Sequence, residues 1–184
     1  LVGYNYSSSK IINSNATGSV DGIDDVGGLV GYNWVSSITN SYATGSVDGT
    51  EDIGGLVGYN TSSSITNSYA TGTVEGDNNV GGFLGIYSSG SLTNNYWDTQ
   101  SSGQTKGIGN GEQLGVTGKT SAQMTKQATF KGWDFSTVWN ITENTTYPWL
   151  QKNPQEQPPK PSFDACCHKA KENTQVPDQP NSTE

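Results

Sequence analysis

The stretch Leu29-Val30-Gly31-Tyr32-Asn33 returns 27 residues later as Leu56-Val57-Gly58-Tyr59-Asn60, and this recurrence decides the fold. The same string opens the chain at residues 1–5 and becomes degenerate at 83–87, so the four starts are 28, 27 and 27 residues apart. A second string, at residues 40–45, is repeated at 67–72. A fixed period of this length predicts a stacked repeat architecture in which each unit contacts mainly its neighbours.

Within a unit, the apolar pattern is that of short strands interrupted by glycine. Ala43 and Val47 share one face of a strand, and the alternation places Tyr42 on the other face together with Ile38. No stretch keeps a helical period, and glycine is too frequent for helix interiors. We therefore predict an all-β fold, a right-handed parallel β-solenoid (β-helix) of about three and a half 27-residue coils.

Stacking in register predicts columns of equivalent residues along the solenoid. Most of these columns are expected to be structural, because apolar side chains fill the core and asparagine amides can hydrogen-bond along the stack. The apolar columns are Ile11, Ile38, Ile65 and Leu92; Val20, Val47 and Val74; and Val26, Ile53 and Val80. The asparagine column is Asn13, Asn40, Asn67 and Asn94.

One aromatic column is a candidate for ligand binding. Tyr42, Tyr69 and Tyr96 alternate with residues of the valine face, so they are predicted to face outward. A row of exposed rings could stack on sugars or anchor a partner protein. The structural alternative is that the rings only pack along the coil surface and shield the backbone.

Acidic residues also recur at turn positions, and these are the candidate metal ligands. Like charges repeated at strand spacing repel one another. Either the side chains point into water or a hard cation such as Ca2+ binds between them. The residues concerned are Asp21, Asp48, Glu75, Asp25 and Asp52. Calcium is the one cofactor that the sequence leaves open.

Composition and charge exclude several classes of function. Only 30% of the residues are hydrophobic, glycine not counted, against roughly 45–50% apolar including glycine in an ordinary globular domain. The net charge of −8 makes nucleic acid a poor partner, and no apolar stretch approaches the ~20 residues of a membrane span. The single histidine, His168, lies beside Cys166 and Cys167 in the tail, so the repeats cannot hold a Ser-His or Cys-His arrangement. We expect no enzyme, although glycoside hydrolysis by carboxylates alone stays open.

Three zones follow one another along the chain. Residues 1–99 are the repeats, and 100–151 are a tryptophan-rich region expected to plug the open end of the solenoid. Thr120-x-x-Gln123 predicts a capping box for one short helix over about 121–128. Residues 152–184 form a proline-rich tail that is expected to be disordered. Because the chain opens within a unit, we expect it to be the closing end of a longer solenoid.

The string Gly54-Gly55-Leu56-Val57-Gly58-Tyr59-Asn60, followed by residues 65–72, resembles the GLUG repeat, a family named for its Gly-Leu-x-Gly core. The resemblance covers residues 1–99, and the region after them resembles the segment that often closes such arrays. GLUG repeats occur in large bacterial and archaeal surface or secreted proteins, including adhesins and the non-catalytic regions of some immunoglobulin-A-cleaving metallopeptidases.

The resemblance implies a non-catalytic structural or adhesive role outside the cell or on its surface, as a rigid stalk or binding scaffold. A glycan or a host or cell-surface protein would be the partner. Two alternatives remain open. One is a calcium-stabilised carbohydrate-binding module, and the other is a β-helical enzyme that degrades polysaccharide.

Overall fold

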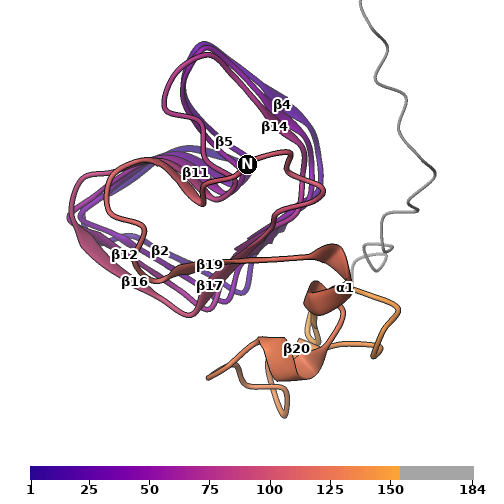
Figure 1. The fold of residues 1–184 in the computed structure, drawn as a ribbon. Helices are drawn as coiled ribbons and strands as arrows, with labels where there is room; N and C mark the ends of the chain where they lie inside the picture. The colour runs from indigo at the N-terminus through magenta and orange to yellow at the C-terminus, as the bar shows by residue number, and fades with distance from the viewer. Residues whose placement is uncertain (154–184) are drawn as a thin grey trace, which may run out of the picture.

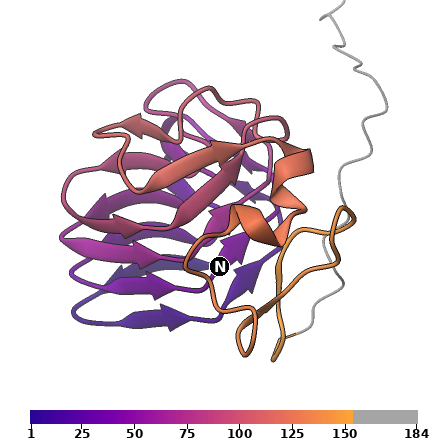
Figure 2. The same cartoon turned by 60° about the horizontal axis from the view of Figure 1, so that its bottom comes forward.

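The chain folds into a β-solenoid whose coils stack along one axis (Figure 1). The computed structural model describes residues 1–153. Strands pair in parallel with the equivalent strands of the neighbouring coils, as Tyr32 does with Tyr4 and Tyr59. In Figure 1 the chain winds counterclockwise as it approaches the viewer, and Figure 2 shows the coils as successive layers. This is the right-handed sense, so the predicted right-handed parallel β-solenoid is confirmed.

Within residues 1–153, five parallel sheets run along the solenoid, one for each straight segment of the coil. The first sheet contains β1 (Val2–Tyr6), β6 (Val30–Trp34), β11 (Val57–Thr61), β15 (Leu84–Tyr87) and β18 (Ile108–Asn110). The second contains β2 (Lys10–Ile12), β7 (Ser37–Thr39), β12 (Ser63–Thr66) and β16 (Gly90–Thr93). The third contains β3 (Asn15–Ala16), β8 (Tyr42–Ala43), β13 (Tyr69–Ala70), β17 (Asn95–Asp98) and β19 (Val116–Lys119). The fourth contains β4 (Val20–Asp21), β9 (Val47–Asp48) and β14 (Val74–Glu75), and the fifth contains β5 (Asp24–Gly27) and β10 (Glu51–Gly54).

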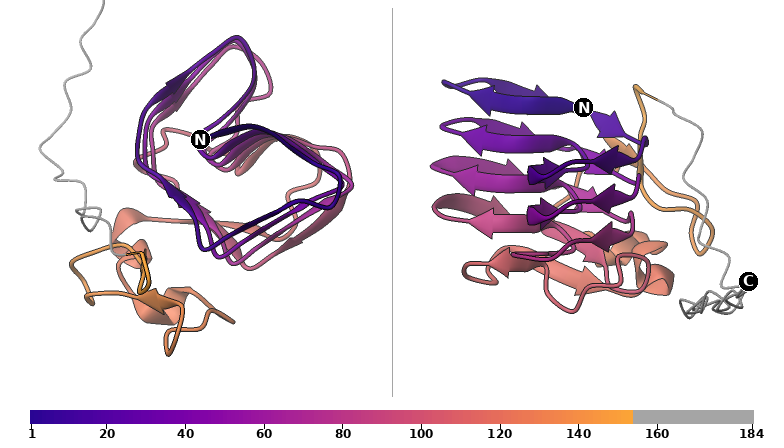
Figure 3. Two further views of the ribbon diagram at one scale, coloured as in Figure 1. Left: turned by 180° about the vertical axis from the view of Figure 1, so that it is seen from behind. Right: turned by 90° about the horizontal axis from the view of Figure 1, so that it is seen from above.

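Each coil has two lobes, which the end-on view of Figure 3 shows clearly. The larger lobe is filled by a core that includes Leu29, Leu56 and the Ile38 and Ile65 column. The smaller lobe holds a separate core of valine and isoleucine, with Ile53 at its centre. The predicted apolar columns are thus confirmed, and each coil buries a thin slice of them against the next coil.

The glycines of the repeated motif lie where the chain crosses between the two lobes. A Cβ atom on Gly58 would clash with the backbone of Asp25 and Val26, and one on Gly54 would clash with the carbonyl of Val57. Two backbone segments therefore pack directly on each other, which only glycine allows. The Gly-Gly pairs at 27–28, 54–55 and 81–82 all lie at such close approaches, to backbone or, for Gly82, to the Trp97 ring, and none of these glycines has positive φ.

Asparagines form the corner between the second and third sheets. Asn40 and Asn67 have φ of 49° and 50°, a left-handed conformation that asparagine tolerates well. Their amides are 3.4 Å apart along the stack, as predicted for an asparagine column. The corner reverses the alternation of side chains, so Ile38 lies in the core while Tyr42 points away from it. Placing both residues on one face was wrong for this reason.

The solenoid continues past the repeats. β18 pairs with β15, and β19 pairs with β17, so residues 100–119 add a further layer to two sheets. The solenoid has about four turns rather than three and a half, and the expected boundary after residue 99 lies inside it. The sequence does not show this layer because its connecting turns differ in length from those of the repeats.

Residues 120–153 form the cap, which packs against the side of the solenoid and not over its end (Figures 1 and 3). Helix α1 (Ser121–Met124) begins with the predicted capping box, since Gln123 N donates to Thr120 Oγ1 and Thr120 N donates to Gln123 Oε1. The helix is shorter than expected and is followed by the 3-10 helix Gln127–Thr129. An antiparallel pair, β20 (Trp139–Asn140) and β21 (Trp149–Leu150), completes the cap.

The expected plug over the open end is therefore wrong, because the aromatic residues of the cap find their partners on the outer face of the third sheet. Within residues 1–153, no helix is long and apolar enough to cross a lipid bilayer. The predicted disordered tail, apart from its first two residues, and the Cys166, Cys167 and His168 group lie outside the described residues.

Candidate functional site

Three carboxylates meet where the fifth sheet begins, and we name Asp24, Asp25 and Asp52 the acidic corner. One carboxylate oxygen of each lies within 4.8 Å of the others. Asp25 and Asp52 occupy the same position in neighbouring coils, with φ of 51° and 58°. Parallel stacking therefore brings together two of the five predicted metal ligands, and Asp24 joins them from the adjacent position in its strand.

The acidic corner is electrostatically strained. Asp52 is buried and accepts a 2.8 Å hydrogen bond from the Asn79 amide, the next residue in its column. Asp25 Oδ1 is buried and, within residues 1–153, accepts no hydrogen bond. Burial and, to a lesser extent, the charges of Asp24, Asp52 and Glu51 raise the pKa of Asp25 to about 6. Such a group can share a proton with its neighbour or act as an oxygen ligand for a hard cation.

The other three predicted ligands lie apart from this corner. Asp21, Asp48 and Glu75 pair in register along the fourth sheet, and their side chains are exposed. Solvent screens their mutual repulsion, so this column corresponds to the solvated alternative that the sequence left open.

The tyrosine row predicted to bind ligand is covered by the cap. Tyr42, Tyr69 and Tyr96 do point away from the solenoid core, but all three are buried in a cluster with the cap residues Trp133 and Trp139. The predicted exposure is therefore wrong, because a segment far along the chain packs over the row. In this arrangement a sugar ring has no access to these side chains.

Specific hydrogen bonds hold the cap in place. The Tyr69 hydroxyl donates to the Pro148 carbonyl at 2.7 Å, and the Tyr147 hydroxyl donates to Asp98 Oδ2 at 2.6 Å. Burial, followed by the hydrogen bond to Asp98, raises the pKa of the Tyr147 hydroxyl, so it remains a donor at neutral pH. The role of the tyrosine row is thus to seat the cap.

A different tyrosine row, exposed at Tyr4 and half-buried at the next two positions, reaches the surface and was not predicted. Tyr4, Tyr32 and Tyr59 stack along the first sheet with ring centroids 4.9 Å apart and nearly parallel planes. Their identical position in the repeated motif was the signal that could have revealed them. Because each ring covers the face of the next, mainly edges and hydroxyls reach solvent, which disfavours the face-on contact that sugars prefer.

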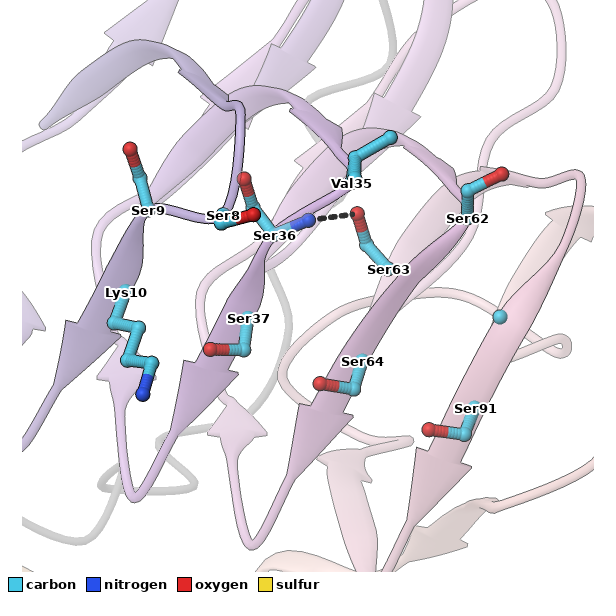
Figure 4. Close-up of a pocket in the computed structure, with 11 residues that line it drawn as sticks. Ser8, Ser9, Lys10, Val35, Ser36, Ser37, Ser62, Ser63, Ser64 and Ser91 are labelled. Carbon is cyan, nitrogen blue, oxygen red and sulfur yellow. Dashed lines mark hydrogen bonds between the residues drawn. The ribbon is translucent and has the colours of Figure 1, made fainter.

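Serines form a shallow hollow of about 380 Å³ at the corner between the first and second sheets (Figure 4). Ser63 Oγ accepts a hydrogen bond from Ser36 N at 3.0 Å and donates to the Thr61 carbonyl at 2.9 Å. These hydroxyls satisfy backbone groups that the corner would otherwise leave unpaired. Ser37, Ser64 and Ser91 point outward in a row beside them, as Figure 4 shows.

No curated protein matches this chain. Among solved structures, the fold is similar to that of a protein described as a putative immunoglobulin A1 protease from Bacteroides ovatus. The two share 19% sequence identity and a TM-score of 0.53, over 83% of this chain and 62% of that chain. This chain thus spans less than two thirds of that structure, and the likeness establishes the fold alone.

The family model of the GLUG motif matches residues 25–48 and 49–75 of this chain. These coils carry the glycine crossing, Asp25 and Asp52 of the acidic corner, and Tyr42 and Tyr69 of the buried tyrosine row. The chain therefore carries two GLUG repeats, within residues 25–75.

Proposed function

We propose that this chain is a non-catalytic scaffold, a rigid segment of a protein that is secreted or displayed at the cell surface. The observation that carries the proposal is the continuity of its columns. The buried side-chain amide of Asn5 donates to Asn33 and that of Asn33 donates to Asn60, each at 2.8 Å along the stack, and apolar columns run beside them. Nearly every repeated position is thus explained by coil-on-coil packing, which favours a role in rigidity.

The distribution of reactive groups supports the same conclusion. Residues 1–153 contain neither histidine nor cysteine, so they can supply neither a nucleophile activated by an imidazole nor a cysteine thiolate nucleophile. The structural neighbour is described as a protease, and in a larger protein of that kind this chain would be the support for another domain.

A cleavage assay tests the scaffold proposal. The purified chain is incubated with immunoglobulin A1 and, separately, with a panel of polysaccharides, and the products are followed by mass spectrometry. We expect no new fragments. Cleavage that disappears in the Asp52→Asn variant but persists in Asp48→Asn would overturn the proposal, because it would place catalysis in the acidic corner.

A calcium-stabilised form of this scaffold is the second candidate, and the acidic corner favours it. Three carboxylates can supply part of the six to eight oxygen ligands that Ca2+ takes, and water or backbone carbonyls would supply the rest. Thermal melts with calcium and with EDTA decide the point. We expect calcium to raise the Tm of the parent and of Asp48→Asn, and to leave Asp52→Asn unchanged. Superimposable melts of the parent would end this candidate.

The extracellular location is part of the proposal and is supported by the GLUG repeat. Labelling intact cells with an antibody against the cap tests it, and signal that appears only after lysis would contradict it. A glycan or a surface protein remains the proposed partner. If a glycan array gives no signal, a surface protein is the remaining candidate.

A further inference from the structure

The last strand of a parallel β-solenoid has one free edge, where unpaired N–H and C=O groups can accept a strand from another molecule. In the first sheet this last strand is β18, which pairs with β15 on one side only. The Gln113 side chain occupies the other side. Ile108 N donates to Gln113 Oε1 at 3.0 Å, and Gln113 Nε2 donates to the Ile108 carbonyl at 2.6 Å.

A second glutamine binds to the free edge of the fourth sheet. The last strand of that sheet is β14, and Gln104 Nε2 donates to the Val74 carbonyl at 2.8 Å. The amide of Val74 donates in turn to the Ser102 carbonyl at 3.1 Å. Both hydrogen-bonding groups of Val74 on its free side are therefore occupied by the segment that follows the repeats.

The chemistry of the glutamine side chain suits this position. A primary amide offers one acceptor and two donors, so it can pair with the N–H and the C=O of a strand residue as a neighbouring strand would. It carries no further backbone, so the ladder ends with it. Close turns at Gly111 and Gly115, with φ of 127° and 69°, keep the chain along this edge.

We propose that Gln104 and Gln113 close the C-terminal edges of the fourth and first sheets, so that a second copy of this chain does not add a strand there. The inference goes beyond the scaffold role, since it concerns which end of the scaffold is closed to partners. It assigns to the segment after the repeats the task of preventing edge-to-edge association, which the cap on the side of the solenoid cannot perform.

The double variant Gln104→Ala/Gln113→Ala tests the proposal, with Gln127→Ala as a matched control at an exposed site in the cap. Sedimentation velocity over a range of protein concentrations measures self-association, and hydrogen exchange by mass spectrometry follows residues 106–110. We expect the double variant to associate at a concentration roughly tenfold below that of the parent, and the Ile108 amide to exchange about fivefold faster. The control should match the parent in both measurements.

The proposal is overturned if the folded double variant sediments as the parent does while the Ile108 amide exchanges faster. It is also overturned if that exchange does not change, because the side chain then protects nothing. Should the double variant fail to fold, Gln113→Leu takes its place. Leucine keeps similar bulk without the amide, and the same two measurements and the same two contrary outcomes apply.

Discussion

Replacing Tyr147 by phenylalanine removes one hydroxyl group from the interface between cap and solenoid. That hydroxyl donates a 2.6 Å hydrogen bond to Oδ2 of Asp98, whose side chain is fully buried. Oδ1 keeps its bonds from the backbone nitrogens of Gln100 and Ser101, at 2.8 and 3.2 Å. The variant therefore leaves half of a buried carboxylate without this donor. A hydrogen bond to a charged group contributes about 1.5–3 kcal/mol, so we expect the free energy of unfolding to fall by about 2 kcal/mol.

Urea denaturation measures this loss, with tryptophan fluorescence reporting on the cap and circular dichroism on the sheets. Tyr87→Phe is the matched control, because its hydroxyl donates to the Gly90 carbonyl at 2.8 Å in an exposed position. We expect the control to lose less than about 0.5 kcal/mol. Equal losses in the two variants would refute the reasoning, since burial of the carboxylate would then have no energetic consequence.

Three further substitutions test other parts of the structure. Tyr42→Phe removes a buried hydroxyl that has no hydrogen-bond partner within residues 1–153, so it should stabilise the fold by about 1 kcal/mol in the same titration; a loss of stability would show that a water molecule satisfies the hydroxyl. Because the folded state raises the pKa of Asp25 to about 6, the contribution of this one group to stability is fully present below pH ~4 and is lost as the pH rises through about 6. In thermal melts, the free energy of unfolding of Asp25→Asn should therefore exceed that of the parent by about 1 kcal/mol at pH 8, after discounting for solvent screening. Near pH 3.5 the two free energies should be almost equal, and an equal difference at both pH values would contradict this. Gly58→Ala places a Cβ atom 2.6 Å from the Val26 nitrogen, whereas Gly3→Ala meets nothing within 4 Å; the first should cost more than about 3 kcal/mol and the second less than about 1 kcal/mol, and similar chemical denaturation midpoints would refute the crossing argument.

The columns were the part of the fold that could be predicted. Ile38 and Ile65, Val47 and Val74, and Asn40 and Asn67 are neighbours in space because the 27-residue period carries the register directly. The acidic corner was predicted in part for the same reason. Asp25 and Asp52 share a column, whereas Asp24 could be added only once the bend at Asp25 was known.

Two predictions were wrong for a common reason: that the row of Tyr42, Tyr69 and Tyr96 is exposed, and that the tryptophan-rich region plugs the open end of the solenoid. Alternation predicts correctly that Tyr69 points out of its coil, but whether solvent or protein lies there depends on the cap. The contact with Pro148 spans 79 residues, and no local pattern encodes a contact of that length. The additional layer at β18 and β19 was missed because pairing there is maintained without the repeated motif.

The 27-residue repeat is enough to specify a stack of equivalent coils, since repetition at a constant spacing leaves few other ways to bury its apolar and glycine positions. The local sequence likewise specifies the capping box at Thr120 and Gln123, which is a local hydrogen-bond pattern. Only the tertiary structure decided which columns meet solvent. The cap covers the row of Tyr42, Tyr69 and Tyr96, Gln113 lies on the free edge of β18, and the first-sheet tyrosine row that begins at Tyr4 stays at least partly exposed. Those outcomes depend on how segments distant in the chain pack against one another. The free energy of bringing whole surfaces together decides that packing, and no single repeat determines it.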